Sequence, residues 1–424
     1  MLQLSFIRSH SEEVVRRLEI KRFKNAAAAV AEIIELDAKK RGLQKESDQL
    51  KSEANKLSKE IGVMMGSGRR EEAELVKAST AAMKSKEKEL SQQLESCEDQ
   101  LHQKLVQLPN LPSMDVPVGE GMEQNLKIHE SGIMPKLAAG ALTHWELAKK
   151  YDLIDFELGV KITGAGFPVY KGKGAKFQRA LIQFFLDEAT AAGYLEIQPP
   201  LLVNAESGFG TGQLPDKEGQ MYHVQLDNLY LIPTAEVPVT NMYRDVILKE
   251  SDLPVKNCAY SACFRREAGS YGKEVRGLNR LHQFDKVEIV QIVHPEKSYQ
   301  VLEGMREYVG GLLQKLGLPY RVMKLCGGDM GFASALTYDF EVWCAAQSLW
   351  LEVSSVSNFE SYQTHRMMCR FKDDQGKIQL CHSLNGSALA LPRIVASLLE
   401  NNQVVEGIHV PDVLQPYTGF KLIQ

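Results

Sequence analysis

One run of polar residues in the second half of the chain has the residue types and spacing of a nucleotide site. Arg265 and Glu267 are two residues apart on a predicted strand. Phe284, Lys286 and Glu288 alternate along the next predicted strand. Alternate residues of a strand share a face, so a guanidinium, an aromatic ring and two carboxylates would converge. Arginine binds phosphate through a bidentate fork, and an aromatic ring stacks on a base. A charged hairpin that faces solvent is the alternative, and spacing does not decide between them.

Three further segments carry groups suited to an amino acid or to ATP. Thr234 and Glu236 share a face at a predicted strand end, where a hydroxyl and a carboxylate would receive an ammonium group. The segment 351–358 supplies a carboxylate and hydroxyls, which are hard oxygen ligands of the kind that Mg²⁺ accepts. Residues 385–387 are expected to begin the last clear helix, and Arg393 within two turns would reach a triphosphate. Alone, each segment also fits an ordinary solvated strand or a capped helix.

The elements that must position these residues fall into two parts that meet near Leu108. All sixteen Pro and all three Trp lie from Pro109 onward, whereas the earlier residues are rich in Lys, Glu, Ala, Gln, Ser and Leu. Proline cannot continue a helix, so the stretch 108–112 indicates a helix stop and a linker. We therefore predict one domain over residues 1–108 and a second over residues 109–424.

The first part carries apolar residues at a spacing of seven. The first set begins at Leu36 and the second at Val76. The positions are Leu36, Leu43, Leu50 and Leu57, with Ile33, Ala54 and Ile61 beside them, and then Val76, Met83, Leu90, Cys97, Leu94, Leu101 and Leu108. This spacing predicts coiled-coil helices, and the glycine-rich stretch 62–68 predicts a turn between them. We expect an antiparallel helical hairpin over about 27–107, roughly 50 Å long. A dimerisation coiled coil is the alternative, although each helix of a hairpin can cover the other's seam.

The second part shows strands that follow one another without a helix between each pair. The expected strands are 195–197, 228–233, 259–266, 282–293 and 349–354, and the expected helices are 177–191, 298–316 and 388–401. This order favours an α+β fold, an antiparallel sheet flanked by helices, over a doubly wound parallel sheet.

Composition excludes several other classes of protein. No apolar run reaches the length of a membrane span, and the first 24 residues lack the features of a signal peptide. The seven Cys form no CxxC pair, so we expect neither a disulfide framework nor protein-bound zinc. A reducing cytoplasm fits this usage. The net charge of −4 does not exclude a nucleic acid held at local basic patches.

Taken together, these segments resemble the class II aminoacyl-tRNA synthetases in their seryl, bacterial-type form. Residues 264–288 resemble motif 2, residues 193–200 resemble motif 1, and residues 385–403 resemble motif 3. Residues 234–236 match the TxE signature of the seryl enzymes. The N-terminal hairpin matches as well, so the resemblance is collinear over essentially the whole chain. It implies a homodimer built partly through motif 1 and a helical arm that binds tRNA.

The resemblance also implies a role for each matching residue. Serine would be held by Thr234, Ala235, Glu236, Glu288, Asn385 and Ser387. ATP would be bound by Arg265, Arg266, Glu267, Val275, Phe284, Glu352, Val353, Ser354, Ser355 and Arg393. The catalytic residues would be Arg265, Arg393 and Glu352, and Mg²⁺ would be held with ATP by Glu352 and Ser355. Three positions depart from the family pattern, namely Val275, Val356 and Ala388, where Thr, Cys and Gly are usual.

The implied activity joins L-serine to tRNA in two steps. ATP would activate serine as seryl-adenylate, and serine would then pass to the 3′ end of serine tRNA, and of selenocysteine tRNA where the cell has one. A ligase that loads a carrier protein from the same core would lack the long arm and need a zinc site. A non-catalytic relative would have lost an Arg or Glu of the site. Neither description fits this sequence.

Overall fold

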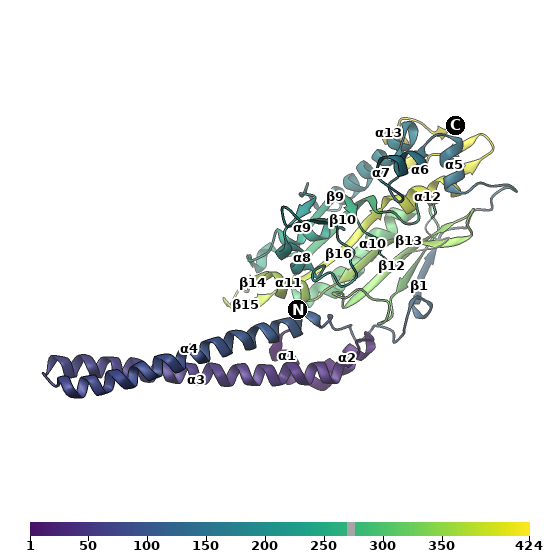
Figure 1. Ribbon diagram of the computed structural model, residues 1–424. Helices are drawn as coiled ribbons and strands as arrows, with labels where there is room; N and C mark the ends of the chain where they lie inside the picture. The colour runs from purple at the N-terminus through teal and green to yellow at the C-terminus, as the bar shows by residue number, and fades with distance from the viewer. Residues whose placement is uncertain (269–275) are drawn as a thin grey trace. The chain divides into compact units, whose positions relative to one another are not determined.

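The computed structural model describes residues 1–268 and 276–424, so Val275 lies outside the described residues. The chain forms two compact units, Met1–Pro109 and Asn110–Gln424, called here the N-terminal and C-terminal units (Figure 1). This division falls one residue after the boundary expected from the sequence. Each unit has its own secondary structure and its own core.

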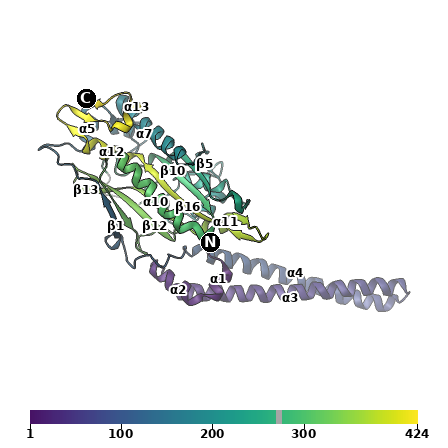
Figure 2. The ribbon, with the colours of Figure 1, turned by 180° about the vertical axis from the view of Figure 1, so that it is seen from behind.

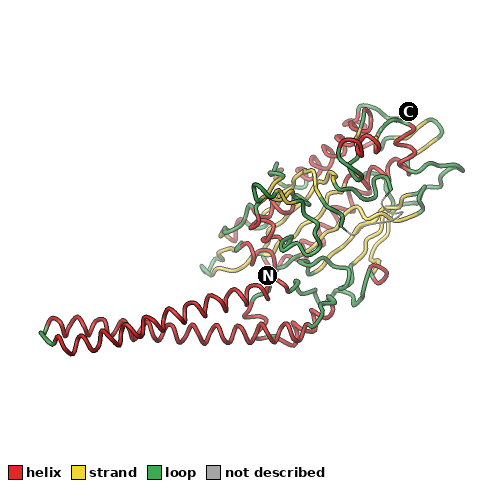
Figure 3. Tube along the Cα trace, viewed as in Figure 1, coloured by secondary structure: helices red, strands yellow, loops and turns green. Residues whose placement is uncertain are grey.

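The N-terminal unit consists of two short helices and two long ones. They are α1 (Leu4–Ser9), α2 (Ser11–Ile20), α3 (Ala26–Gly66) and α4 (Arg70–Gln107). Figure 3 shows α3 and α4 side by side, joined by a short loop at one end. Ile33, Leu90, Cys97 and Leu101 of the predicted seams are buried between them. The antiparallel hairpin is therefore confirmed, although Gly62 continues α3 and the turn is shorter than predicted.

Charged side chains link the two long helices at their solvent-exposed edges. Lys40 lies 2.9 Å from Glu98, and Lys86 lies 2.9 Å from Glu46. Exposed ion pairs of this kind gain little, because water and salt screen both charges. The stability of the hairpin therefore rests on its apolar seam.

An eight-stranded sheet forms the centre of the C-terminal unit. In spatial order its strands are β1 (Leu126–Ser131), β11 (Tyr320–Lys324), β12 (Leu336–Cys344), β13 (Leu349–Asn358), β16 (His382–Ala390), β10 (Gln283–Val293), β9 (Val255–Phe264) and β4 (Leu195–Glu196). Every neighbouring pair is antiparallel except β4 and β9, which are parallel. The predicted antiparallel sheet is confirmed, and β1, β11, β12 and β16 are strands that the sequence pattern did not indicate.

The three longest described helices of the C-terminal unit pack against this sheet and supply much of its core. They are α7 (Gly172–Ala191), α10 (Ser298–Lys315) and α12 (Leu391–Asn401). Along α10, Leu302, Met305, Val309 and Leu312 are buried at the spacing of one helix face. Figure 2 shows α10 lying over the sheet. Burial of this apolar face fixes the strands that carry the polar residues described below.

One predicted element is wrong in a way that matters for the site. Residues 385–387 were expected to begin a helix, but they lie inside β16, and α12 begins only at Leu391. A Cβ atom on Gly386 would lie 2.9 Å from a methyl group of Val356, so a glycine permits close packing there. Pairing with β10 and β13 on both sides overrides the local turn preference of Asn-Gly-Ser.

The remaining elements of the C-terminal unit are short. The helices are η1 (Met122–Gln124), α5 (His144–Lys150), α6 (Phe156–Ile162), α8 (Ala205–Thr211), α9 (Glu236–Asn241), η2 (Glu250–Asp252), η4 (Pro295–Lys297), α11 (Tyr362–Met367), η5 (Asp412–Leu414) and α13 (Gln415–Thr418). The strands are β2 (Ile154–Asp155), β3 (Val169–Tyr170), β5 (Leu202–Val203), β6 (His223–Val224), β7 (Leu229–Leu231), β8 (Ile247–Lys249), β14 (Arg370–Lys372), β15 (Ile378–Leu380), β17 (Gln403–Val404), β18 (Gly407–His409) and β19 (Leu422–Ile423).

All seven cysteines of the chain are buried as free thiols. Within residues 1–268 and 276–424, none of the helices combines the length and the apolar character that a membrane crossing requires.

Candidate active site

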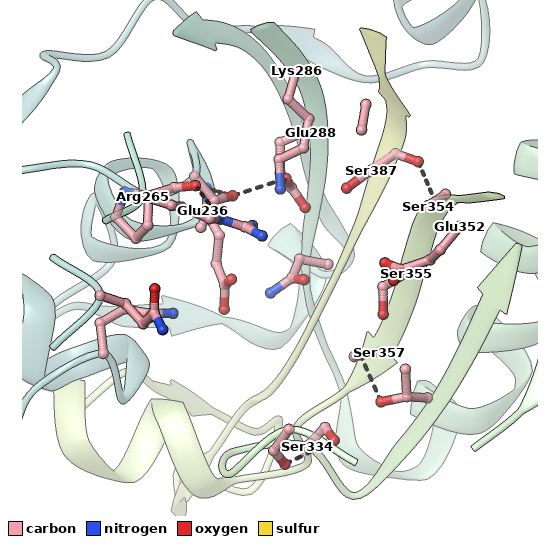
Figure 4. A pocket seen from close by; sticks show the side chains of 18 of the residues that line it. Glu236, Arg265, Lys286, Glu288, Ser334, Glu352, Ser354, Ser355, Ser357 and Ser387 are labelled. Carbon is pink, nitrogen blue, oxygen red and sulfur yellow. Dashed lines mark hydrogen bonds and ion pairs between the residues drawn. The ribbon is translucent and has the colours of Figure 1, made fainter. Parts of the chain in front are cut away.

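A cavity of about 740 Å³ opens over β10, β13 and β16 and collects most of the residues singled out from the sequence. Figure 4 shows part of the lining as sticks and labels, among the predicted residues, Glu236, Arg265, Glu288, Glu352, Ser354, Ser355 and Ser387. The predicted residues that line it are Thr234, Glu236, Arg265, Glu267, Phe284, Glu288, Glu352, Val353, Ser354, Ser355, Asn385, Ser387 and Arg393. Ala235 is fully buried and Arg266 is exposed, and neither lines the cavity.

Glu288 on β10 is the centre of one end of the cavity. Its carboxylate accepts a hydrogen bond from the Thr234 hydroxyl at 2.9 Å and forms an ion pair with Lys286 on the same strand. The side chains of Lys286 and Glu288 are only 7% and 2% exposed. A buried charge needs such a partner, because transfer from water is otherwise too costly. The alternation of Phe284, Lys286 and Glu288 along β10 brings all three to the cavity.

Glu236, the first residue of α9, lies beside this pair. Its Oε1 accepts a hydrogen bond from the Gln363 amide at 2.7 Å, and the Ser383 hydroxyl donates to Gln363 at 2.7 Å. Burial raises the pKa of Glu236 to about 7, the nearby charge of Glu288 adds to this effect, and Gln363 and Lys286 oppose it. Two carboxylates therefore share one lysine, which leaves this end of the cavity suited to one more positive charge.

Asn385 and Ser387 on β16 form another part of the same end. Glu288 pairs with Ser387 across the β10–β16 ladder, so strand register sets their separation. The Asn385 amide lies close enough to Glu236 to favour its charged form, yet its buried Nδ2 has no partner at hydrogen-bond geometry among the described residues. Buried donors in native proteins are nearly always paired. Asn385 thus offers a donor to a molecule in the cavity.

Arg265 lies in the cavity lining beside Pro233 and Phe284. Arg265 and Glu267 were predicted to lie on a strand, but β9 ends at Phe264 and both residues lie just beyond it, where Glu267 has a left-handed backbone with φ of 48°. The Arg265 guanidinium lies 5.1 Å from the centre of the Phe284 ring, and its Nε donates to the Pro233 carbonyl at 3.4 Å. An arginine held in this way keeps other N–H groups for an anion.

Arg393 is held by two backbone carbonyls rather than by a carboxylate. Its NH1 donates to the carbonyl of Glu352 at 2.8 Å, and its Nε donates to the carbonyl of Asn279 at 2.9 Å. The Glu352 carboxylate is farther away, at 3.7 Å, and its side chain is 50% exposed. The guanidinium plane is therefore fixed while its charge stays available to a phosphate.

Asp339 on β12 is a cavity residue that the motifs did not single out as a ligand. It pairs with Ser355 across the β12–β13 ladder. Burial raises the pKa of Asp339 well above its usual range, the charge of Glu352 raises it further, and Ser355 opposes both. Its Oδ1 is buried without a partner among the described residues. Gln363 was missed for a different reason, because nothing in its local sequence signals that it faces Glu236.

Comparison with known proteins gives the arrangement its class. Residues 222–402 match the family described as tRNA synthetase class II core domain (G, H, P, S and T). Residues 1–112 match the Seryl-tRNA synthetase N-terminal domain. The serine--tRNA ligase of Salinibacter ruber is 48% identical over 425 residues, which cover 100% of this chain and 99% of the relative.

Two solved structures agree over the full length. The seryl-tRNA synthetase of Pyrococcus horikoshii complexed with ATP has a TM-score of 0.94 at 33% identity, and the match covers 100% of this chain and 99% of that one. The cytoplasmic serine-tRNA ligase of Naegleria fowleri in complex with AMP has a TM-score of 0.88 at 26% identity, with the same coverage. The fold is thus that of a class II aminoacyl-tRNA synthetase. Within that class, the chain belongs to the seryl-tRNA synthetase family.

Proposed function

We propose that the chain activates L-serine with ATP and transfers it to the 3′ end of serine tRNA. In the first step an oxygen of the serine carboxylate attacks the α-phosphorus of ATP, and pyrophosphate leaves. In the second step the terminal ribose hydroxyl of the tRNA attacks the activated carbonyl, and AMP leaves. No side chain needs to act as a covalent nucleophile, so catalysis is positioning and charge stabilisation.

The observation that carries this proposal is the uneven charge of the cavity. At one end Glu236 and Glu288 share the single charge of Lys286, which suits the ammonium group of an amino acid. Thr234 and Asn385 add polar groups within reach of a small hydroxyl. Because these groups are buried, alanine would leave some of them unpaired, and the site would reject it.

The other end of the cavity suits the triphosphate. Arg265 would stabilise charge on the α-phosphate beside the carboxylate of serine, and Arg393 would bind the γ-phosphate. Phe284 and Glu267 would place the adenine. Glu352, Ser355 and Asp339 offer hard oxygen ligands that fit the Mg²⁺ that accompanies ATP, where the ion would neutralise phosphate charge.

The remaining proposals concern partners. We propose that α3 and α4 contact tRNA, because their apolar seam is covered within the hairpin and their outer faces carry many lysines. We also propose a cytoplasmic homodimer formed partly through residues 193–200. The edge strand β4 in that segment presents Leu195 with 64% of its surface exposed, and an exposed apolar residue on a sheet edge favours pairing with another chain.

Exchange of labelled pyrophosphate into ATP tests the first step directly. Serine should support rapid exchange, whereas alanine, glycine and threonine should each be poorer by about 10² or more. The assay needs no tRNA, so it separates amino-acid activation from tRNA binding. Exchange driven as well by alanine as by serine would remove serine as the substrate.

A further inference from the structure

A buried cluster of polar residues lies apart from the cavity lining. His144, Cys344 and Glu400 are each 0% exposed, and their ligand-type atoms lie within 4.8 Å of one another. The trio has the composition of a metal site, but its imidazole is already engaged on both sides. His144 Nδ1 lies 2.9 Å from Glu400 Oε1, and His144 Nε2 accepts a hydrogen bond from the backbone N–H of Leu278 at 2.9 Å. The cluster is therefore a hydrogen-bond network.

Glu400 is the acceptor at the centre of this network. Its Oε1 accepts from the His144 backbone N–H at 2.8 Å and from the Gln347 amide at 2.9 Å. Its Oε2 accepts from the backbone N–H groups of Ala346 and Gln347 at 3.0 and 3.2 Å. Burial alone would raise the pKa of Glu400, but hydrogen bonds from His144 and the Cys344 thiol outweigh it and lower the pKa. An ionised carboxylate thus ties α5, α12 and the β12–β13 turn together.

The network fixes the backbone that leads into the cavity. Nε2 of His144 must carry the lone pair that Leu278 needs, so the ring proton lies on Nδ1 and is donated to Glu400. Gly277 has φ of 68°, and a Cβ atom there would lie 2.3 Å from Nε2 of His144. Residues 277–278 therefore rest directly on the imidazole ring, and only glycine allows that approach.

Two connections run from this network to Arg393. The side-chain amide of Asn279 donates to the side-chain carbonyl of Gln347 at 2.9 Å. The backbone carbonyl of Asn279 accepts a hydrogen bond from Arg393 Nε at 2.9 Å. Arg393 and Glu400 also lie seven residues apart on α12, which puts them on the same side of the helix. One end of α12 thus reaches the cavity through Arg393, and the other is anchored by Glu400.

We propose that His144 and Glu400 are positioning residues for ATP binding. They hold residues 277–279 in place, so that the backbone carbonyl of Asn279 orients Arg393. The proposal rests on the proposed function, in which Arg393 binds the γ-phosphate. It predicts a selective defect, because the serine end of the cavity is held by Thr234, Lys286 and Gln363, which form no hydrogen bond or ion pair with His144 or Glu400 among the described residues.

Three substitutions of His144 separate its two hydrogen bonds. His144→Leu removes both hydrogen bonds. His144→Asn keeps only a donor near the position of Nδ1, which faces Glu400. His144→Gln keeps only an acceptor near the position of Nε2, which faces Leu278. The KM values for ATP and for serine are measured by pyrophosphate exchange. We expect the Leu and Asn variants to raise the KM for ATP about tenfold, because a buried N–H of Leu278 loses its acceptor. The Gln variant should stay within about threefold, and the KM for serine should change less than twofold in all three.

Tyr243→Phe serves as a matched control. It removes a partly buried hydrogen bond that Tyr243 accepts from Asn257 at 2.7 Å, away from the cavity lining, and it should leave both KM values unchanged. Thermal melting shows whether each variant is folded. If His144→Leu does not fold, Gln347→Met removes the side-chain hydrogen bonds to Asn279 and Glu400 but keeps the imidazole and its hydrogen bonds to Leu278 and Glu400, and it should still raise the KM for ATP selectively.

The outcomes distinguish this proposal from the proposed function. Absence of serine-dependent exchange in the unaltered protein would remove the function itself. Normal exchange in that protein, with equal increases of both KM values in the His144 variants, would show a general structural role instead. Equal KM values for ATP in His144→Gln and His144→Leu would show that the hydrogen bond to Leu278 does not position ATP.

Discussion

The two units place charge in opposite environments. On the arm formed by α3 and α4, the paired side chains Lys86 and Glu46 are 56% and 46% exposed. In the cavity of the C-terminal unit, Lys286 and Glu288 are 7% and 2% exposed. Exposed pairs are screened by water and salt, whereas a buried group that loses its partner leaves a charge without compensation. Single charges should therefore be replaceable on the arm and indispensable in the cavity.

The largest test of this difference removes the arm altogether. Replacing Ala27 to Leu105 by a short Gly/Ser linker should leave serine-dependent exchange largely intact, since the cavity residues all belong to the C-terminal unit. Charging of serine tRNA should fall by about 10³ or more, the order expected when several phosphate contacts are lost. Acylation of tRNA with labelled serine measures this. Equal charging by the truncated and intact proteins would make the arm a structural or partner-binding element.

In the cavity, a single substitution should be nearly as damaging. Arg265→Ala should slow exchange by about 10² to 10³, because a preorganised donor to the α-phosphate is lost. The effect should fall mainly on kcat, with a smaller change in the KM for serine. Arg179→Ala is the matched control, since Arg179 on α7 is exposed and lies outside the cavity lining. A loss that is equal in both variants would take Arg265 out of the chemical step.

Acidic pH should weaken serine binding before it affects ATP. The pKa of Glu236 is raised to about 7, so its carboxylate is charged above that pH and neutral below it. The ammonium group of serine needs the charged form, so kcat/KM for serine should fall about tenfold for each pH unit below 7. Above pH 7 the profile should be flat. Glu236→Gln should have low activity at every pH, and a slope that persisted in that variant would assign the titration to another group.

The smallest effect is expected for one lysine of the arm. Lys84 on α4 is exposed and has no ion-pair partner within the described residues. Lys84→Ala should reduce charging only about threefold and should lower the slope of log affinity against log salt by about 1, as for one phosphate contact. Lys84→Arg keeps the charge and should behave as the unaltered protein. A slope unchanged in Lys84→Ala would place this lysine outside the tRNA contact.

Local sequence predicts the arm far better than the cavity. Leu36, Leu43 and Leu50 recur every seven residues, and this spacing alone predicts a coiled-coil helix. Such a helix needs only one neighbouring helix to cover its apolar seam. Motif 2 was equally informative for β10, where Phe284 and Glu288 alternate toward one face. In both regions the information lies within a few residues of the element that uses it.

The rest of the site depends on pairing between distant segments. Asn385 and Ser387 have the local character of a turn or helix cap, but β10 and β13 draw them into β16. Gln363 on α11 bonds Glu236 on α9 although the two residues lie 127 positions apart in the sequence. Asp339 becomes a cavity residue through its register opposite Ser355. The spacing of residues within one segment does not show which distant segments it will pair with. The resemblance to known proteins therefore supplied site residues that the local sequence pattern did not indicate.

The burial of every cysteine has a practical consequence for studying the arm. A thiol that is covered by protein does not meet a labelling reagent, so the seven native thiols should remain unmodified in the folded chain. Ser67 lies exposed in the loop between α3 and α4. A fluorophore attached through Ser67→Cys would therefore report from a single known position while tRNA is titrated, without prior removal of any native cysteine.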